Sequence, residues 1–386
     1  MTKGPLVPLK MFLFSYYATN TIIISYLPLY LQYKGLTNAE VGWVLAIGPL
    51  ATILAQPFWG FLSDKYKTVK KILLICVSGM LVASTIFFQM DVLVAILLSA
   101  GLFYFFSTPI GALGDSLAQR RAFELKVPFG SIRTWGSIGF AVSSLVIGFV
   151  LTNIGIQYMI FPYLMFGVFA LFIATRLQDV QVSSEPVQLH DVKKMFSNKP
   201  YIFFLILIIF LCLTHRANDS FVGLYIVELG GSESLVGLAW FVGVISEAVV
   251  FALAGYWFKK YHPMVFVILA GALYSIRWLF FASAQSPFMV IALQSLHGVT
   301  FAVFYLAAFD YIARMVPRSL QSTGHLIFFS VFFGVSGIIG ALMGGSIMEA
   351  YGGTTLYQVI AGFAFTGTIL LTIYHTVIFK MRARNI

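Results

Sequence analysis

The feature that most constrains this chain is a succession of long apolar runs separated by Gly, Pro and charged clusters. An α-helix needs roughly 20 residues to cross about 30 Å of hydrocarbon, and twelve runs are long enough. They lie near residues 8–33, 38–62, 71–89, 92–119, 130–152, 156–176, 200–228, 234–258, 263–284, 287–314, 320–348 and 355–379. With 60% hydrophobic and only 10% charged residues, the chain must have lipid as its main solvent. We therefore predict an all-α integral membrane protein with twelve transmembrane helices.

The distribution of Lys and Arg predicts the orientation of these helices. If the N-terminus is cytoplasmic, the external loops hold only Lys34, and Arg133, Arg216 and Arg277 lie within helices. Every other cation then falls on the cytoplasmic side, as the positive-inside rule requires. We expect a multi-pass protein of the cytoplasmic membrane with both termini inside. The net charge of +10 is then a signal of topology and not of nucleic-acid binding.

The chain also contains an internal repeat. Matched positions are Gly60 with Gly255 and Asp115 with Asp310, both 195 apart, and Gly148 with Gly345, 197 apart. We predict two six-helix bundles, residues 1–176 and 200–386, joined by a polar cytoplasmic linker at 177–199. Duplication of this kind is a recurring transporter architecture, with the solute site near the midplane between the halves.

The segment that ends the second predicted helix reads Gly60-Phe-Leu-Ser-Asp64-Lys65-Tyr-Lys67-Thr-Val69-Lys70-Lys71. It resembles the helix 2–3 loop signature of the major facilitator superfamily, with Lys67 in place of the second Gly and Val69 in place of a cation. The resemblance implies that Gly60, Asp64, Lys65, Lys70 and Lys71 form a cytoplasmic gate. An acid at a helix end can pair with cations or a helix N-terminus in one access state and release them in the other. The alternative is a solvated basic loop.

A finer resemblance rests on Arg133-Thr-Trp135-Gly136-Ser-Ile-Gly139 and on Gln294-Ser-Leu-His297-Gly298 with Phe301. These stretches are similar to the branch that holds the lactose permeases, the phenylpropionate permeases and the nucleoside–proton symporters. The resemblance implies transport of a small organic solute such as a sugar, a nucleoside or an aromatic acid.

Ionisable residues within a membrane are costly unless they are paired or hydrated, so each is a functional candidate. Asp115 and Arg133 both lie about 8 Å from the cytoplasmic boundary and could form an ion pair. In the lactose-permease pattern an acid and an arginine 18 positions apart hold the substrate, and the same spacing occurs here. Trp135 could stack on a sugar or aromatic ring. The alternative is an ion pair that only fixes two helices together.

The second half carries Asp219, Glu247, Arg277 and His297 within its predicted helices. Glu247, Arg277 and His297 fall in the middle third of the bilayer, and motion of Arg277 towards or away from Glu247 would change the proton affinity of the carboxylate. The resemblance implies an arginine and a histidine 20 positions apart, as found here, and a proton-binding acid one turn later, where this chain has Thr300. The proton site is then Glu247 or, as second choice, Asp219. The alternatives are static ion pairs and an absence of coupling.

Further polar side chains within helices need a hydrated cavity or a partner, and we place them with Asp115, Arg133, Trp135 and His297 in the substrate site. They are Tyr16, Asn20, Tyr225, Gln294 and Tyr305. Asp310 and Arg314 lie one turn apart at a cytoplasmic helix end and are expected to form a gating ion pair.

We predict a secondary active transporter, most simply a proton-coupled symporter, with a proton-coupled exporter of drug-like or lipid compounds as the alternative. Walker, HExxH and Cys/His metal motifs do not occur, so no enzyme activity, cofactor or metal is expected. The expected partners are a small-molecule solute, protons and the lipid bilayer, and a monomer suffices for this mechanism.

Overall fold

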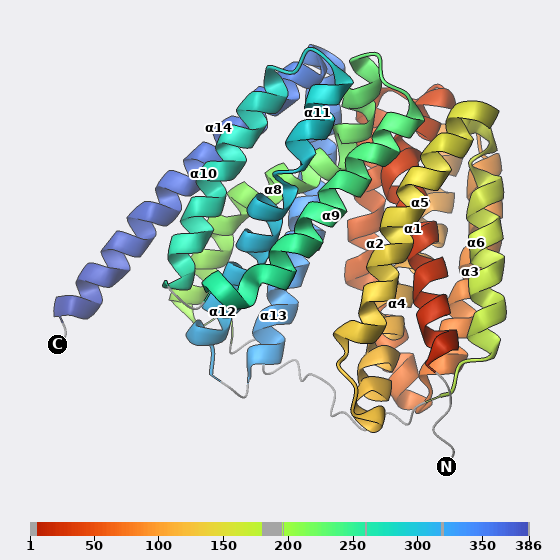
Figure 1. The fold of residues 1–386 in the computed structure, drawn as a ribbon, viewed down its shortest axis with the longest axis horizontal. Helices are drawn as coiled ribbons and strands as arrows, with labels where there is room; N and C mark the ends of the chain where they lie inside the picture. Colours follow the sequence, from red (N-terminus) through yellow and green to blue (C-terminus); the bar gives the residue numbers. More distant parts are fainter. Residues whose placement is uncertain (1–5, 180–194, 196, 259–260, 318–319, 385–386) are drawn as a thin grey trace. The chain divides into compact units, whose positions relative to one another are not determined.

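The computed structural model describes residues 6–179, 195, 197–258, 261–317 and 320–384, and these contain helices but no β-strand (Figure 1). Lys193, Lys194, Lys259 and most of the predicted linker therefore lie outside the described residues. The first half comprises α1 (Val7–Tyr33), α2 (Asn38–Lys65), α3 (Val69–Gln89), α4 (Leu93–Leu125), α5 (Gly130–Ile154), the 3₁₀ turn η1 (Ile156–Tyr158) and α6 (Ile160–Thr175).

The second half has the same kind of helices but more interruptions. It comprises α8 (Lys199–Glu228), α9 (Glu233–Trp257), α10 (Pro263–Ala282), α11 (Pro287–Gln294), η3 (Gly298–Ala302), α12 (Val303–Met315), α13 (Gln321–Phe329), η5 (Ser330–Val335) and α14 (Ser336–Arg384). Segments η3 and η5 are π-helical. Helix α14 is bent at Gly352, where φ is 80°.

Ten helical segments of the described chain are long and apolar enough to cross a membrane. One of them, Thr323–Val377, contains the bend at Gly352 and so covers two of the predicted spans. Helix α1 has 27 residues but is not among the ten. The helical segments match the predicted ones in position, and the count of twelve spans stays a prediction.

The chain divides into two compact units, Met1–Pro186 with Gly231–Phe241, and Val187–Gly230 with Val242–Ile386. In the first unit α1 packs on α5 and α6, and α4 packs on α2 and α3. In the second unit α14 packs on α8 and α10, and α10 also contacts α12. The division into bundles 1–176 and 200–386 stays a prediction, because the N-terminal part of α9, up to Phe241, is grouped with the first unit.

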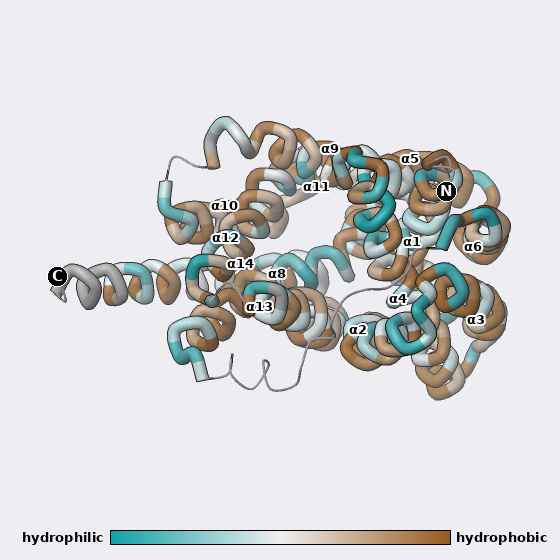
Figure 2. Tube along the Cα trace, turned by 90° about the horizontal axis from the view of Figure 1, so that it is seen from below, coloured by the Kyte–Doolittle hydropathy of each residue, from teal (hydrophilic) through white to brown (hydrophobic). Residues whose placement is uncertain are grey.

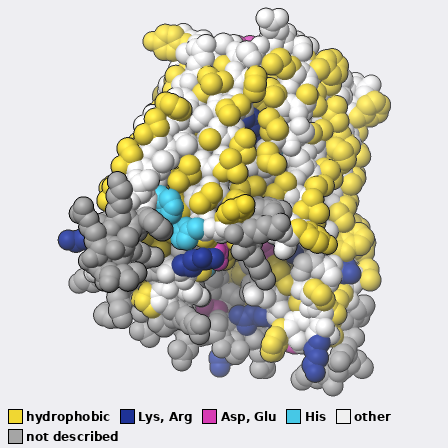
Figure 3. Space-filling model, turned by 60° about the vertical axis from the view of Figure 1, so that its left-hand side comes forward, with side chains coloured by type: hydrophobic (Ala, Val, Ile, Leu, Met, Phe, Trp, Pro, Cys, Tyr) yellow, Lys and Arg dark blue, Asp and Glu magenta, His cyan; other side chains and the backbone are white. Residues whose placement is uncertain are grey.

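The outward surfaces of the helices are apolar. Large side chains such as Leu98, Phe149, Phe161, Ile206 and Phe365 are exposed. Figure 2 shows hydrophobic residues along all the helices, and Figure 3 shows one face on which most charged and His side chains gather at the lower end. Exposed apolar surface of this extent is expected where hydrocarbon, and not water, surrounds the helices.

Two close helix approaches position the polar side chains. A Cβ atom on Gly139 of α5 would lie 2.8 Å from the Phe14 Cα of α1. A Cβ atom on Gly298 would lie 2.9 Å from the Glu247 backbone nitrogen of α9, and the Gly298 N–H donates to Ser246 Oγ at 3.0 Å. Because the neighbouring atoms belong to the backbone and cannot turn aside as a side chain can, only glycine fits at either crossing.

Candidate functional site

The first polar cluster lies in the first unit, where α1, α4 and α5 meet. Arg133 Nε lies 3.0 Å from Asp115 Oδ1 and donates to Oδ2 at 3.1 Å. The Tyr17 hydroxyl donates to the same Oδ2 at 3.4 Å, and its ring centroid is 4.2 Å from Arg133 Cζ. The structure thus contains the ion pair that the 18-residue spacing predicts. The side chains of Arg133 and Asp115 are 29% and 33% exposed, so both are partly accessible.

Tyr17 is a member of this cluster that the sequence analysis did not select. Its neighbour Tyr16, which was selected, is buried and donates to the Ser107 carbonyl at 3.1 Å. The signal was present, because Tyr17 is a polar-tipped residue in the same apolar run. Hydropathy alone does not say which of two adjacent tyrosines faces Asp115.

The remaining predicted side chains of the first unit lie beside the ion pair or deeper between helices. Asn20 and Tyr16 line a cavity of about 60 Å³ together with Tyr104 and Thr108. Trp135 is 40% exposed and its ring lies 5.9 Å from Lys10 Nζ. These positions leave the Trp135 ring available for stacking.

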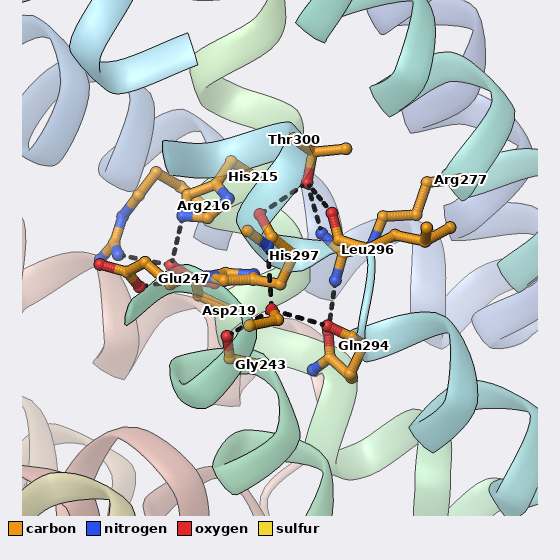
Figure 4. Close-up of polar contacts among 12 residues, drawn as sticks. His215, Arg216, Asp219, Gly243, Glu247, Arg277, Gln294, Leu296, His297 and Thr300 are labelled. Carbon is orange, nitrogen blue, oxygen red and sulfur yellow. Dashed lines mark hydrogen bonds and ion pairs between the residues drawn. The ribbon is translucent and has the colours of Figure 1, made fainter. Parts of the chain in front are cut away.

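The second polar cluster lies in the second unit and begins on α8 (Figure 4). Arg216 donates to Asp219 Oδ2 at 2.8 Å, one turn away on the same helix. His215 Nε2 lies 3.4 Å from the same oxygen, and His215 Nδ1 is 3.1 Å from the Tyr274 hydroxyl of α10. The other oxygen of Asp219 is buried and has no hydrogen-bond partner among the described residues. His215 was not selected from the sequence, although a histidine within an apolar run and one turn before Asp219 is such a signal.

A second acid–histidine pair adjoins the first. His297 Nε2, at the junction of α11 and η3, lies 3.6 Å from Glu247 Oε2 of α9. The His297 ring centroid is 5.3 Å from that of His215, and Phe301 stacks on His215 at 4.5 Å. The close crossing of Gly298 against α9 brings His297 to Glu247.

In this structure Arg277 has partners other than Glu247, and the motion of Arg277 towards or away from Glu247 stays a prediction. Arg277 is fully buried and donates to the Thr300 hydroxyl at 3.0 Å and to the Gln294 side-chain carbonyl. Its guanidinium lies 4.6 Å from the Trp278 ring centroid. Hence Thr300, at the position where the resemblance implies an acid, is a neutral partner of the arginine.

Two other predicted binding residues pack against protein groups, Tyr225 fully buried and Tyr305 partly exposed. Tyr225 is buried and donates to the Phe281 carbonyl at 2.8 Å. Tyr305 stands in an aromatic group, 5.5 Å from Phe301 and 6.2 Å from Phe329 between ring centroids. In this structure Tyr225 is an interhelical contact and Tyr305 lines the η5 side of the cluster.

The predicted gate residues at the ends of α2, α3 and α12 behave differently from one another. Arg314 pairs with Asp310 at 2.7 Å, as the i,i+4 spacing predicts. Asp64 forms no ion pair with any residue that the structure describes. Lys65 Nζ lies 5.7 Å from the Tyr66 ring, and Gly60 faces open space.

An acid that the sequence analysis missed caps α3 instead. Asp179 accepts the backbone N–H groups of Val69 and Lys70 at 3.0 Å each, and also the Thr68 hydroxyl. Lys70 Nζ donates to the Thr175 carbonyl at 2.7 Å, and the Lys71 N–H donates to Thr68 Oγ1. A carboxylate at a helix N-terminus is favoured by the helix dipole. The start of α3 is therefore joined to the chain after α6 by Asp179 and by the Lys70–Thr175 hydrogen bond.

Comparison with known proteins agrees with this architecture. The profile of the MFS_1 like family matches residues 6–359. The chain is 28% identical over 365 residues to the uncharacterized transporter YwbF of Bacillus subtilis (strain 168), covering 92% of this chain and 90% of that protein. It is 27% identical over 352 residues to a maltose permease of Geobacillus stearothermophilus, covering 89% and 88%.

Among solved structures, the chain is similar to the nucleoside transporter NupG, with a TM-score of 0.86. At 16% identity, that match covers 97% of this chain and 99% of the other, and it shows a shared fold.

Proposed function

Because the chain belongs to the MFS_1 like family of major facilitator transporters, we propose that it is a proton-coupled symporter and that its solute is a sugar. The chain is a secondary transporter and not an enzyme, and its relatives are named as a transporter and a permease. The observation that carries the proposal is the coexistence of a partly exposed Asp115–Arg133 pair and a cluster of acids and histidines whose side chains, apart from that of Glu247, are no more than 11% exposed.

The first cluster has the chemistry that binds sugars. The Asp115 carboxylate accepts hydroxyl protons, the Arg133 guanidinium donates from a planar fork, and the Tyr17 and Trp135 rings offer apolar faces. Relatives of this chain are named for maltose, sucrose, raffinose and lactose. Others are named for 3-phenylpropionic acid or nucleosides, so those solutes belong in the same assay.

The second cluster has the chemistry that binds protons. Carboxylates removed from water hold protons more readily, and histidine changes charge in the physiological pH range. His297 and Glu247 are 3.6 Å apart, so uptake of one proton changes the strength of their contact. We assign solute contact to the Glu247–His297 pair and to Gln294 nearby, and proton binding to the cluster as a whole.

The direct test is proton movement during solute entry. Proteoliposomes that contain a trapped pH-sensitive dye receive maltose, sucrose, lactose, uridine or 3-phenylpropionate in separate samples. We expect one solute to acidify the lumen, and Glu247→Gln to abolish this signal. Glu124→Gln is the matched control, because it removes an exposed acid whose partner is Arg121. Exchange of labelled solute without proton movement in the wild type would refute symport.

The same assay tests export by proton exchange. An exporter would instead move protons out of the lumen as the solute enters, so the lumen becomes alkaline. The sign of the dye signal therefore separates the two directions of coupling.

We further propose that both termini are cytoplasmic. Cys76 and Cys212 are buried, so single cysteines introduced at Lys67 and Ser232 can be labelled against a low background. A membrane-impermeant maleimide added to intact cells should label position 232 and leave position 67 unlabelled. The opposite pattern would reverse the topology.

A further inference from the structure

Two acid–histidine pairs lie side by side within the second unit (Figure 4). Glu247 lies 3.6 Å from His297, and Asp219 lies 3.4 Å from His215. The two imidazole rings are 5.3 Å apart between centroids, with 37° between their planes. The four groups thus follow one another from α9 through the start of η3 to α8, with a ring-to-ring contact, and not a hydrogen bond, between the two imidazoles.

The two ends of this series differ in exposure. The Glu247 side chain is 27% exposed, whereas the side chains of His297, His215 and Asp219 are 8%, 5% and 11% exposed. Glu247 can therefore meet water and solute, while Asp219 is reached mainly through other protein groups. From this order we propose that Asp219 is the site that holds the coupled proton, and that His297 and His215 connect it with Glu247. The inference rests on the proposed symport and names its proton site.

The contacts of His215 suit such a transfer. Neutral His215 with its hydrogen on Nε2 donates towards Asp219 and accepts the Tyr274 O–H at Nδ1. A proton released by the His297 imidazolium adds to His215 Nδ1 as the Tyr274 hydroxyl turns away from that nitrogen, and the Nε2 proton then passes to Asp219 Oδ2. The net change is one proton moved from His297 to Asp219, while His215 changes tautomer and Tyr274 becomes an acceptor. Two imidazolium rings at this separation repel each other, so the series takes up one proton at a time.

The surroundings of Asp219 explain why its protonation would have a structural effect. The titratable and charged groups that face it are His215 and Arg216 on α8, His297 at the start of η3, Arg277 and Tyr274 on α10, and Tyr357 on α14. Asp219 Oδ2, which lies 3.4 Å from His215 Nε2, is the oxygen that receives the proton, and the buried Oδ1 has no hydrogen-bond partner among the described residues. A neutral Asp219 no longer holds Arg216, whose guanidinium lies 5.7 Å from the Phe333 ring of η5. Proton uptake is thereby linked to the π-helical turn η5.

The test compares Asp219→Asn, Asp219→Glu and His215→Gln with the wild type and the Glu124→Gln control in proteoliposomes. Two readouts are taken: solute-driven proton uptake, and equilibrium exchange of labelled maltose or of the panel solute that the wild type exchanges. Exchange needs no net proton movement. We expect Asp219→Asn to keep exchange but to lose proton uptake by about 100-fold, the lower range for a positioned proton-transfer group. Asp219→Glu should restore part of the proton uptake. His215→Gln should slow proton uptake while the exchange of labelled solute is retained.

The outcomes separate this inference from the proposed function. Exchange without proton uptake in the wild type refutes symport, and the assignment falls with it. Proton uptake in both the wild type and Asp219→Asn leaves symport standing and overturns the assignment. If the Asp219→Asn variant does not insert into the membrane or does not exchange solute, the His215→Gln variant decides the question. Intact proton uptake in His215→Gln overturns the proposed transfer through the two histidines, whereas lost proton uptake with retained solute exchange supports it.

Discussion

The Asp115–Arg133 pair can serve either as a structural tie between α4 and α5 or as a solute-binding group, and a double-mutant cycle separates the two roles. Unit charges about 4 Å apart attract by about 4 kcal/mol at an effective dielectric constant of about 20. Because both side chains are about one-third exposed, desolvation and screening offset part of this attraction. We expect a coupling energy of about 1–3 kcal/mol in the stability of the protein, within the range seen for contacting residues.

The cycle consists of Asp115→Asn, Arg133→Gln and the double variant, each measured by thermal unfolding and by solute binding. Each single variant leaves one charge without its partner and should be less stable, whereas the double variant should recover stability. Solute binding should not recover, because a hydrogen bond to a charged group contributes about 1.5–3 kcal/mol, or about 10–150-fold in Kd. A double variant that binds solute as the wild type does would refute the role in binding and leave a structural ion pair.

Three further predictions concern local geometry. Gly298→Ala should lower the free energy of unfolding by about 1–3 kcal/mol through overpacking, and should also weaken proton coupling. Gly255 faces open space, so Gly255→Ala should have neither effect. Thermal unfolding measures the stability of both variants, and the dye assay measures their proton coupling. Glu228→Ala should destabilise the bend in α14 by about 1 kcal/mol, because both carboxylate oxygens accept the Gly353 N–H at 3.1 Å. Hydrogen exchange of the Gly353 amide should become faster, and an unchanged exchange rate would contradict this role of Glu228. Asp179→Ala removes the N-terminal cap of α3 and should lower the free energy of unfolding by about 1 kcal/mol. Limited proteolysis near α3 should increase, and an unaltered cleavage pattern would show that the cap is dispensable.

The helical segments were predictable because apolar length and the Gly, Pro and charge clusters between runs depend only on local sequence. Helix α4 nevertheless continues to Leu125 where hydropathy predicted an end near 119, because a helix can extend beyond the hydrocarbon into its polar boundary. The π-helical segments were not predicted, since a change of hydrogen-bond register leaves the hydropathy pattern unaltered.

For the polar clusters, the position of each residue along its helix was easier to predict from the sequence than the side of the helix on which it lies. Asp115 and Arg133 share a depth and do pair, and 18-residue spacing across a short loop left little freedom. Glu247 and Arg277 also share a depth but face different neighbours, because position along a helix does not fix the side of the helix on which a residue lies. His215 could have been selected, because it is an ionisable residue within an apolar run and lies one turn before Asp219.

The π-helical segment η5 bears on the internal repeat of the chain. A π turn holds one more residue than an α turn, so a single inserted residue can be absorbed there while the following helix keeps its face. The internal repeat has an offset of 195 at Asp310 and of 197 at Gly345, and Ser330–Val335 lies between these two positions. One of the two added residues fits in η5. A one-residue difference in length between the halves can therefore be absorbed in η5 without turning the helix that follows it.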